Sequence, residues 1–181
     1  MNTTTIKDYE VMAPVGSRES LQAAIQAGAD SIYFGVEQLN MRSHSANHFT
    51  IDDLREIAAT CAEHGMKSYL TVNTIIYDED VELMHQIVDA AYEAKISAVI
   101  ASDVAVMTYC RKKGVEVHLS TQLNISNAEA LEFYAQFADV VVLARELNMD
   151  QVAYIHSQIS KRNIVGPNGD PVRIEMFCHG A

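Results

Sequence analysis

Short apolar segments alternate with amphipathic segments along most of the chain. The apolar segments have the length of β-strands, and most are hydrophobic at successive positions. A strand in a parallel sheet is covered on both faces, so it tends to be apolar throughout. The pattern therefore predicts buried parallel strands at Tyr9–Ala13, Ser31–Phe34, Lys67–Val72, Ala98–Ala101, Glu116–Leu119, Val140–Leu143 and Arg173–Phe177.

Between these strands, apolar residues recur at the spacing of one face of an α-helix. We therefore expect helices between the strands, each packing its apolar face on the sheet. The predicted faces are formed by Leu21, Ala24, Ile25 and Gly28, by Leu54, Ile57, Ala58 and Cys61, by Met84, Ile87, Val88 and Ala91, and by Val152, Ile155, His156 and Ile159.

Residues at the expected helix ends match known capping patterns. The segments Thr50–Asp53 and Ser126–Glu129 resemble capping boxes, in which a side chain accepts a hydrogen bond from the first helical turn. Gly28, Gly65 and Gly114 each follow a helical segment, where a left-handed backbone conformation is common. These signals support the alternation of strands and helices.

Alternating strands and helices predict an α/β fold with a parallel sheet, either open and doubly wound or closed into a barrel. About seven strand–helix steps, without a glycine-rich dinucleotide loop after the first strand, favour a TIM-type (β/α) barrel. A complete barrel has eight strands, and the chain ends after the seventh. We therefore expect residues 1–181 to be the N-terminal barrel portion of a longer protein, truncated after about seven strands.

Composition narrows the class of protein. Hydrophobic residues make up 49% of the chain, which excludes a disordered protein, and no apolar run is long enough to cross a membrane. Three dispersed cysteines and the lack of a secretory signal lead us to expect a cytoplasmic protein with reduced thiols. The net charge of -11 argues against nonspecific binding of nucleic acids or anionic membranes by the chain as a whole.

Polar residues follow most of the predicted strands. In a parallel barrel the reacting groups project from the carboxyl ends of the strands, where the strand–helix loops converge. We therefore predict catalytic residues at Asn73, Asp103, Gln122, Arg145, Glu146 and His179. Substrate-binding roles are predicted for Arg42, in the long loop after the second strand, and for Ser120 and Glu175.

Several of these residues also have a structural interpretation. Asp103 is well placed to cap the helix that follows it, and Asn73 to satisfy backbone groups of its loop. Arg145 and Glu146 could form an ion pair that serves only the fold. The sequence leaves both interpretations open for each residue.

Motifs of the common hydrolases are missing from the sequence. It has no Gly-x-Ser-x-Gly elbow, no His-Glu-x-x-His zinc helix and no Gly-x-x-x-x-Gly-Lys phosphate loop. Cys178 and His179 directly follow the last predicted strand, and adjacent residues of an extended chain point to opposite faces, so we do not expect them to form a nucleophile–base pair. We therefore expect no intrinsic protease activity from this chain.

Six ordered blocks of the sequence resemble the U-32 peptidases, a collagenase-like family. The segment Val11–Ser17 is similar to the family opening L-x-[SA]-P-[AV]-G, and Ala27–Gly35 to G-A-D-A-V-Y-x-G. Glu175–Ala181 looks like the first half of the signature E-x-F-x-x-G-[AS]-x-C. The resemblance runs from Glu10 onward, and its middle blocks are Val72–Thr74, Ser102–Asp103, His118–Gln122 and Leu143–Leu147.

The resemblance implies a cofactor and a chemistry. In family members, cysteines that follow this signature ligate a [4Fe-4S] cluster, so the implied ligands lie beyond Ala181. Cys178 occupies a variable position of the signature, and no metal site is expected within this chain. Better understood branches resemble hydroxylases that modify uridine in transfer RNA or cytidine in 23S ribosomal RNA, with prephenate linked to the reaction.

The resemblance thus predicts the barrel portion of an iron–sulfur-dependent RNA hydroxylase. Its expected partners are RNA or a prephenate-like small molecule, and a membrane is not expected among them. A homodimer formed through the unfinished barrel edge is a further expectation. Two alternatives stay open, namely a collagenase-like peptidase and a non-catalytic scaffold that pairs with a cluster-bearing partner.

Overall fold

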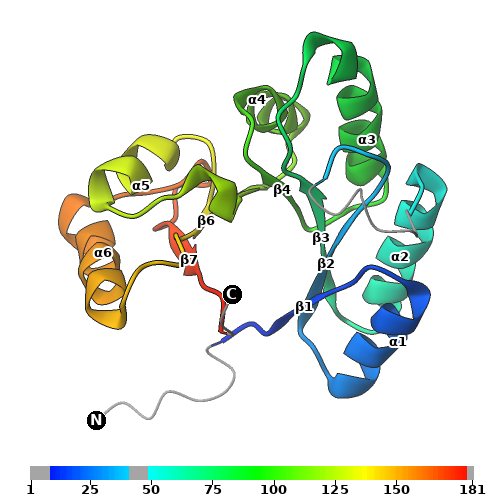
Figure 1. Cartoon of the computed structure of the whole chain (residues 1–181), viewed down its shortest axis with the longest axis horizontal. Helices are drawn as coiled ribbons and strands as arrows, with labels where there is room; N and C mark the ends of the chain where they lie inside the picture. The colour runs from blue at the N-terminus through cyan, green and yellow to red at the C-terminus, as the bar shows by residue number, and fades with distance from the viewer. Residues whose placement is uncertain (1–8, 41–48, 179–181) are drawn as a thin grey trace.

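The computed structural model describes residues 9–40 and 49–178, in which seven parallel strands form one curved sheet (Figure 1). Each strand pairs with the next in chain order, which confirms the predicted barrel-like parallel sheet. The strands are β1 Met12–Pro14, β2 Ser31–Gly35, β3 Lys67–Val72, β4 Ala98–Ala101, β5 Val117–Leu119, β6 Val140–Val142 and β7 Arg173–Glu175.

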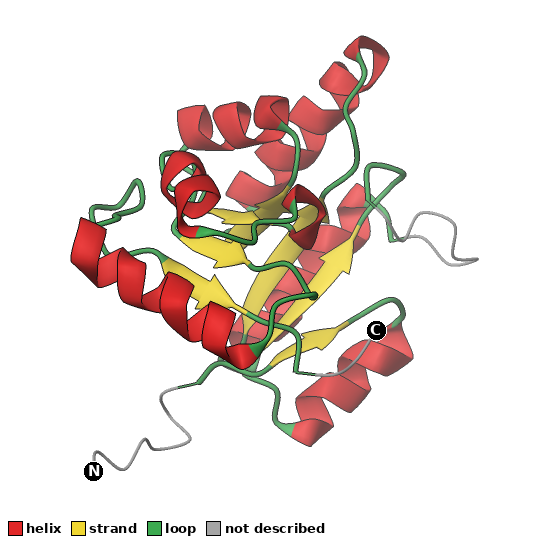
Figure 2. Ribbon diagram, turned by 60° about the vertical axis from the view of Figure 1, so that its left-hand side comes forward, coloured by secondary structure: helices red, strands yellow, loops and turns green. Residues whose placement is uncertain are grey.

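The helices lie on the convex side of the sheet and surround the strands (Figures 1 and 2). In the described ranges they are α1 Arg18–Ala27, α2 Ile51–Glu63, α3 Val81–Glu93, α4 Val104–Lys113, α5 Ala128–Tyr134 and α6 Met149–Arg162, with the short 3-10 helices η2 Asp78–Asp80 and η3 Thr121–Leu123. None of the helices in the described residues is long and apolar enough to cross a membrane.

The sheet separates two clusters of apolar side chains. Phe34 and Leu70 belong to the large core between the strands and the helices, and both are fully buried. Neighbouring strand residues point to opposite faces. A smaller cluster, which contains Tyr69, Ala98 and Ile100, therefore lies on the concave face, away from the helices. This concave face is the interior of the partial barrel.

Two predicted helix features differ in the structure. The cap of α5 is Asn127 rather than Ser126, because the Asn127 side chain accepts a hydrogen bond from the Ala130 backbone amide at 2.9 Å. His156 is exposed although its spacing predicted a place on the apolar face of α6, and Gln158 is buried there instead. The predicted capping box at Thr50 is confirmed.

Both outer strands of the sheet have one unpaired side within the described residues, since β1 pairs only with β2 and β7 only with β6. Tyr9 and Val11, just before β1, are 68% and 58% exposed. An unpaired strand edge beside exposed apolar groups favours pairing with another chain. We propose that a second copy covers this edge.

The first prediction concerns solution mass. We expect the chain to have about twice the 20.0 kDa mass of one copy by light scattering. Val11→Lys should shift the equilibrium toward a monomer, because a lysine beside a strand edge opposes pairing. Tyr154→Lys, on an equally exposed residue of α6, is the matched control. A wild-type monomer at all concentrations would contradict the prediction.

Candidate functional site

A pocket of about 170 Å³ lies at the carboxyl ends of the strands. Its walls come from side chains on the concave face of the sheet and from the loops that follow β3, β5, β6 and β7. The lining residues are Tyr33, Thr71, Asn73, Ile100, Ser120, Thr121, Gln122, Val142, Arg145, Glu175 and Phe177. This is the end of a parallel barrel at which active sites form.

Two carboxamide side chains from different strands meet in this pocket. The Nδ2 group of Asn73, which follows β3, donates hydrogen bonds to Ser120 Oγ at 3.2 Å and to Gln122 Oε1 at 3.1 Å. Ser120 is buried and donates its hydroxyl hydrogen to Gln122 Oε1. Ser120 is the residue just before η3, and this short helix after β5 brings Gln122 close to Ser120 and Asn73. The three side chains form one connected polar wall.

An arginine on an aromatic ring forms another part of the pocket. The guanidinium carbon of Arg145 lies 4.1 Å from the centroid of the Phe177 ring. Such a cation–π contact orients the guanidinium group while leaving its N–H donors free to bind an anion. Arg145 is exposed, so its positive charge is accessible from solvent.

Glu175, at the end of β7, brings a carboxyl group into the same pocket. Burial raises the pKa of Glu175 to about 7, and the negative charge of Glu10 acts in the same direction. The raised pKa places its protonation change near neutrality, where a carboxyl group can both donate and accept a proton.

A layer of charged side chains, formed by Glu10, Lys67, Glu116 and Arg173, lies at the amino-terminal ends of the strands. Glu10 accepts hydrogen bonds from Lys67 Nζ at 2.6 Å and from the Tyr69 hydroxyl at 2.5 Å. Burial alone would raise the pKa of Glu10, but the bonds from Lys67 and Tyr69 outweigh it and lower the pKa. Glu10 is therefore ionised at neutral pH.

A second carboxylate of this layer, Glu116, is held in a similar way. Its Oε1 atom lies 2.7 Å from a guanidinium nitrogen of Arg173 and 3.1 Å from Nε2 of His118. The hydrogen bond with His118, followed by the attraction of Arg173, lowers the pKa of Glu116. The His118 ring also packs against Tyr69 at 4.8 Å between centroids, which joins the two carboxylates into one interior layer.

The structure brings five of the predicted site residues together in the pocket, namely Asn73, Ser120, Gln122, Arg145 and Glu175. Asp103 does not line it. Instead its carboxylate accepts hydrogen bonds from the backbone amides of Ala105 and Ile76, at 2.8 and 3.2 Å, and so caps α4 and fixes the loop after β3.

The other predictions fall elsewhere. Glu146 is exposed and does not line the pocket, although it follows Arg145 directly. Arg42 and His179 lie outside the described residues. Sequence reasoning also missed Tyr33 and Thr71, whose alternation along β2 and β3 could have placed them on the concave face.

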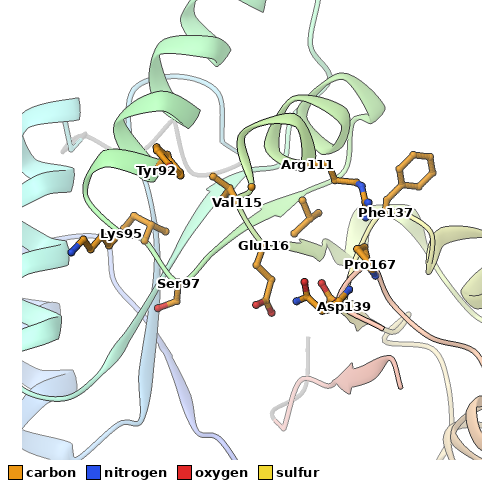
Figure 3. A pocket seen from close by; sticks show the side chains of 13 residues that line it. Tyr92, Lys95, Ser97, Arg111, Val115, Glu116, Phe137, Asp139 and Pro167 are labelled. Atoms are coloured by element: carbon orange, nitrogen blue, oxygen red, sulfur yellow. The ribbon is translucent and has the colours of Figure 1, made fainter. Parts of the chain in front are cut away.

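A larger pocket, of about 510 Å³, lies at the opposite end of the strands (Figure 3). Several of its polar groups already have partners within the protein. Asp139 accepts a hydrogen bond from the Asn168 amide, Arg111 donates to the Gln136 carbonyl, and Glu116 binds Arg173. Groups at this end of a parallel barrel generally serve stability. The smaller pocket is therefore the better candidate site.

The described cysteines do not fit an iron–sulfur cluster. Cys61 and Cys110 are buried in two different helices, α2 and α4, and burial raises their thiol pKa values to about 11 and about 12. Cluster ligands are thiolates, which a raised pKa disfavours. Cys178 is exposed beyond β7. Within the described residues no three side chains of the metal-binding types are grouped.

The family model described as Peptidase family U32 matches residues 16–181. The chain belongs to peptidase family U32. This confirms the resemblance seen in the sequence, and it agrees with the partial barrel.

Curated relatives of this U32 chain have two kinds of name. A protein named collagenase from Porphyromonas gingivalis strain W83 is 69% identical over 97% of this chain and 42% of its own length. A protein named tRNA hydroxylation protein P1 from Bacillus subtilis strain 168 is 32% identical over 97% of this chain and 39% of its own length. The U32 chain thus spans about two fifths of these relatives.

A solved structure of a U32 peptidase has the same fold. It superimposes with a TM-score of 0.71 at 14% identity, over 92% of this chain and 67% of that one. At this identity the similarity supports the fold alone.

The second prediction concerns pH and stability. Since the pKa of Glu116 is lowered, its contribution to folding is present above the unfolded value of about 4.3 and is lost as pH falls through the folded pKa. Glu116→Gln should therefore lower the unfolding free energy by about 1–2 kcal/mol at pH 7, and by much less near pH 3. Urea unfolding measures both values. Glu79→Gln, an exposed carboxylate in η2, should change neither, and an equal loss for Glu116→Gln at both pH values would refute the linkage.

Proposed function

We propose that this U32 chain is the barrel portion of an iron–sulfur-dependent RNA hydroxylase. The observation that supports it best is the pocket at the strand ends, which combines a stacked guanidinium group, two carboxamides and a carboxyl group that titrates near neutrality. The proposal is also consistent with a relative, named for tRNA hydroxylation, that aligns over 97% of the chain.

The pocket suits an anionic or nucleobase ligand. Arg145 on Phe177 can pair with a carboxylate or phosphate through parallel N–H donors, and a base can stack on such a guanidinium plane. The carboxamides of Asn73 and Gln122 can hydrogen-bond the edge of a pyrimidine or the oxygens of a prephenate-like acid. A uridine of transfer RNA or a cytidine of 23S ribosomal RNA is the proposed target.

Under this proposal the iron–sulfur cluster and most RNA-binding groups belong to other parts of a longer protein. The [4Fe-4S] cluster would be held by cysteines beyond Ala181, because Cys61 and Cys110 are buried in separate helices. The net charge of -11 also suggests that most contacts with the RNA backbone come from other parts of the protein.

A peptidase mechanism has less support from the pocket itself. The Ser120 hydroxyl donates to the amide oxygen of Gln122, whereas a nucleophilic serine needs a basic partner that can take its proton. The raised pKa values of Cys61 and Cys110 oppose thiolate formation. A collagenase-like peptidase is kept as the second candidate because a relative with 69% identity has the name collagenase.

The third prediction tests the hydroxylase proposal in cells. A strain that lacks the gene should lose a hydroxylated uridine or cytidine from digested transfer RNA or 23S ribosomal RNA, as measured by mass spectrometry. The complete reading frame should restore the nucleoside, while Arg145→Ala should reduce it by about tenfold or more, because a positioned charged contact is lost. Arg55→Ala, on the exposed side of α2, is the matched control. Unchanged nucleosides in the deletion strain would refute the proposal.

The fourth prediction concerns proteolysis. We expect neither the chain nor the complete reading frame to cleave gelatin after rigorous purification. The peptidase candidate would gain if purified protein cleaved gelatin and if Ser120→Ala or Cys178→Ala abolished the cleavage. Cleavage that persists in both variants would point to a contaminating protease, and an activity-stained gel would show whether it migrates with the chain.

A further inference from the structure

Glu175 occupies a distinctive position in the strand-end pocket. It is the last residue of β7 and pairs in register with Val142 of β6, which lines the same pocket. Its carboxyl group is partly buried, and the titratable or charged side chains that share the pocket with it are Tyr33 and Arg145. An acid in such a place faces any molecule bound beside Arg145.

A second carboxylate, Glu10, acts on Glu175 from the segment before β1. Lys67 and Tyr69 of β3 hold Glu10 in its ionised form through bonds of 2.6 and 2.5 Å. The negative charge of Glu10 disfavours a second negative charge on Glu175. The pKa of Glu10 is thus lowered while that of Glu175 is raised, and carboxyl groups with such different environments commonly take different roles in acid–base chemistry.

The remaining charged groups of the interior are already balanced against one another. On β7 the guanidinium group of Arg173 lies two residues before Glu175, and it pairs with Glu116. Glu116 also binds His118 of β5. Arg173 pairs with Glu116 and does not line the strand-end pocket. Arg145 is the cation among the residues that line it.

We propose that Glu175 is the general acid–base residue of the strand-end pocket and that Glu10, which Lys67 and Tyr69 hold in place, is a positioning residue for it. The inference rests on the proposed function for its substrate, an oxygen-bearing acid or a nucleobase. In the forward step the O–H bond of Glu175 breaks, and the proton passes to an oxygen or nitrogen of the bound molecule. The resulting carboxylate shares the pocket with the Arg145 guanidinium group, and water returns the proton after product release.

The first test is a direct titration that needs no enzymatic activity. With ¹³C-labelled glutamate, the carboxyl signal that disappears in Glu175→Gln should titrate in the wild-type chain with a midpoint of about 7. Glu10→Gln should lower that midpoint by part of its shift, because the negative charge of Glu10 is removed while burial, the larger cause, remains. Glu63→Gln, an exposed carboxylate at the end of α2, should leave it unchanged.

Two results of the titration would overturn the inference. A wild-type midpoint near 4 would show that Glu175 is not protonated at neutral pH and so cannot act as the acid. A raised midpoint that stays the same in Glu10→Gln would show that Glu10 has no effect on Glu175. Should Glu10→Gln fail to fold, the wild-type midpoint still decides whether Glu175 holds a proton at neutral pH.

The second test uses the reaction of the complete reading frame. Glu175→Gln should lower kcat by about a hundredfold or more while KM changes little, because general acid–base catalysis acts in the transition state. Glu175→Asp should recover part of the activity with a shifted pH profile. Full activity of Glu175→Gln would overturn the catalytic role.

Failure of the proposed function would look different. The hydroxylated nucleosides would then be independent of the gene, while the titration of Glu175 and its response to Glu10→Gln would still be observed. That outcome would support the acid pair and would refute only RNA hydroxylation as its use.

Discussion

The charged layer inside the curved sheet holds the strands in the arrangement that the pocket requires. Lys67 and Tyr69 bind the Glu10 carboxylate, and Arg173 binds Glu116. The two carboxylates are partly buried while Lys67 and Arg173 are about half exposed, so each pair contributes a modest stabilisation to the fold. Because the partners come from the segment before β1, from β3, from the residue before β5 and from β7, the layer ties both sides of the partial barrel to one another. The pocket lies one layer above it, on the same strands.

The two-residue period of a strand connects this layer with the pocket. On β7, Arg173 belongs to the charged layer, Glu175 to the pocket and Phe177 to the platform under Arg145. On β3, Lys67 lies in the charged layer and Asn73 at the pocket, three steps of two residues further on. Alternate residues of one strand share a face, so the same strands supply structural charges at one level and binding groups at the next. Glu10, just before β1, belongs to the charged layer, and its negative charge acts with burial to raise the pKa of Glu175.

The sequence predicted those parts of the fold that depend on a local pattern. β3 and β4 have their predicted bounds, because all their residues except Lys67 are buried and form continuous apolar-rich segments. The cap of α5 was misplaced by one residue, since both Ser126 and Asn127 can accept the required hydrogen bond and only the backbone decides between them. Asn73, Gln122 and Arg145 could be assigned to one end of the barrel by a general rule. The role of Glu10 could not be predicted, because a charged residue before the first strand has the same local pattern as a solvated one.

The chemistry of the pocket limits what the barrel portion itself can contribute to hydroxylation. Adding a hydroxyl group to a nucleobase requires oxidation or transfer of the group from a donor. The polar side chains that line the pocket are carboxamides, hydroxyl groups, a guanidinium group and a carboxyl group, and these exchange hydrogen bonds and protons. Under the proposed function, Arg145 and the carboxamides would bind and orient the substrate, and Glu175 would move a proton. If the hydroxyl group is transferred from a bound anionic small molecule, the guanidinium group of Arg145 would bind the negative charge of that donor.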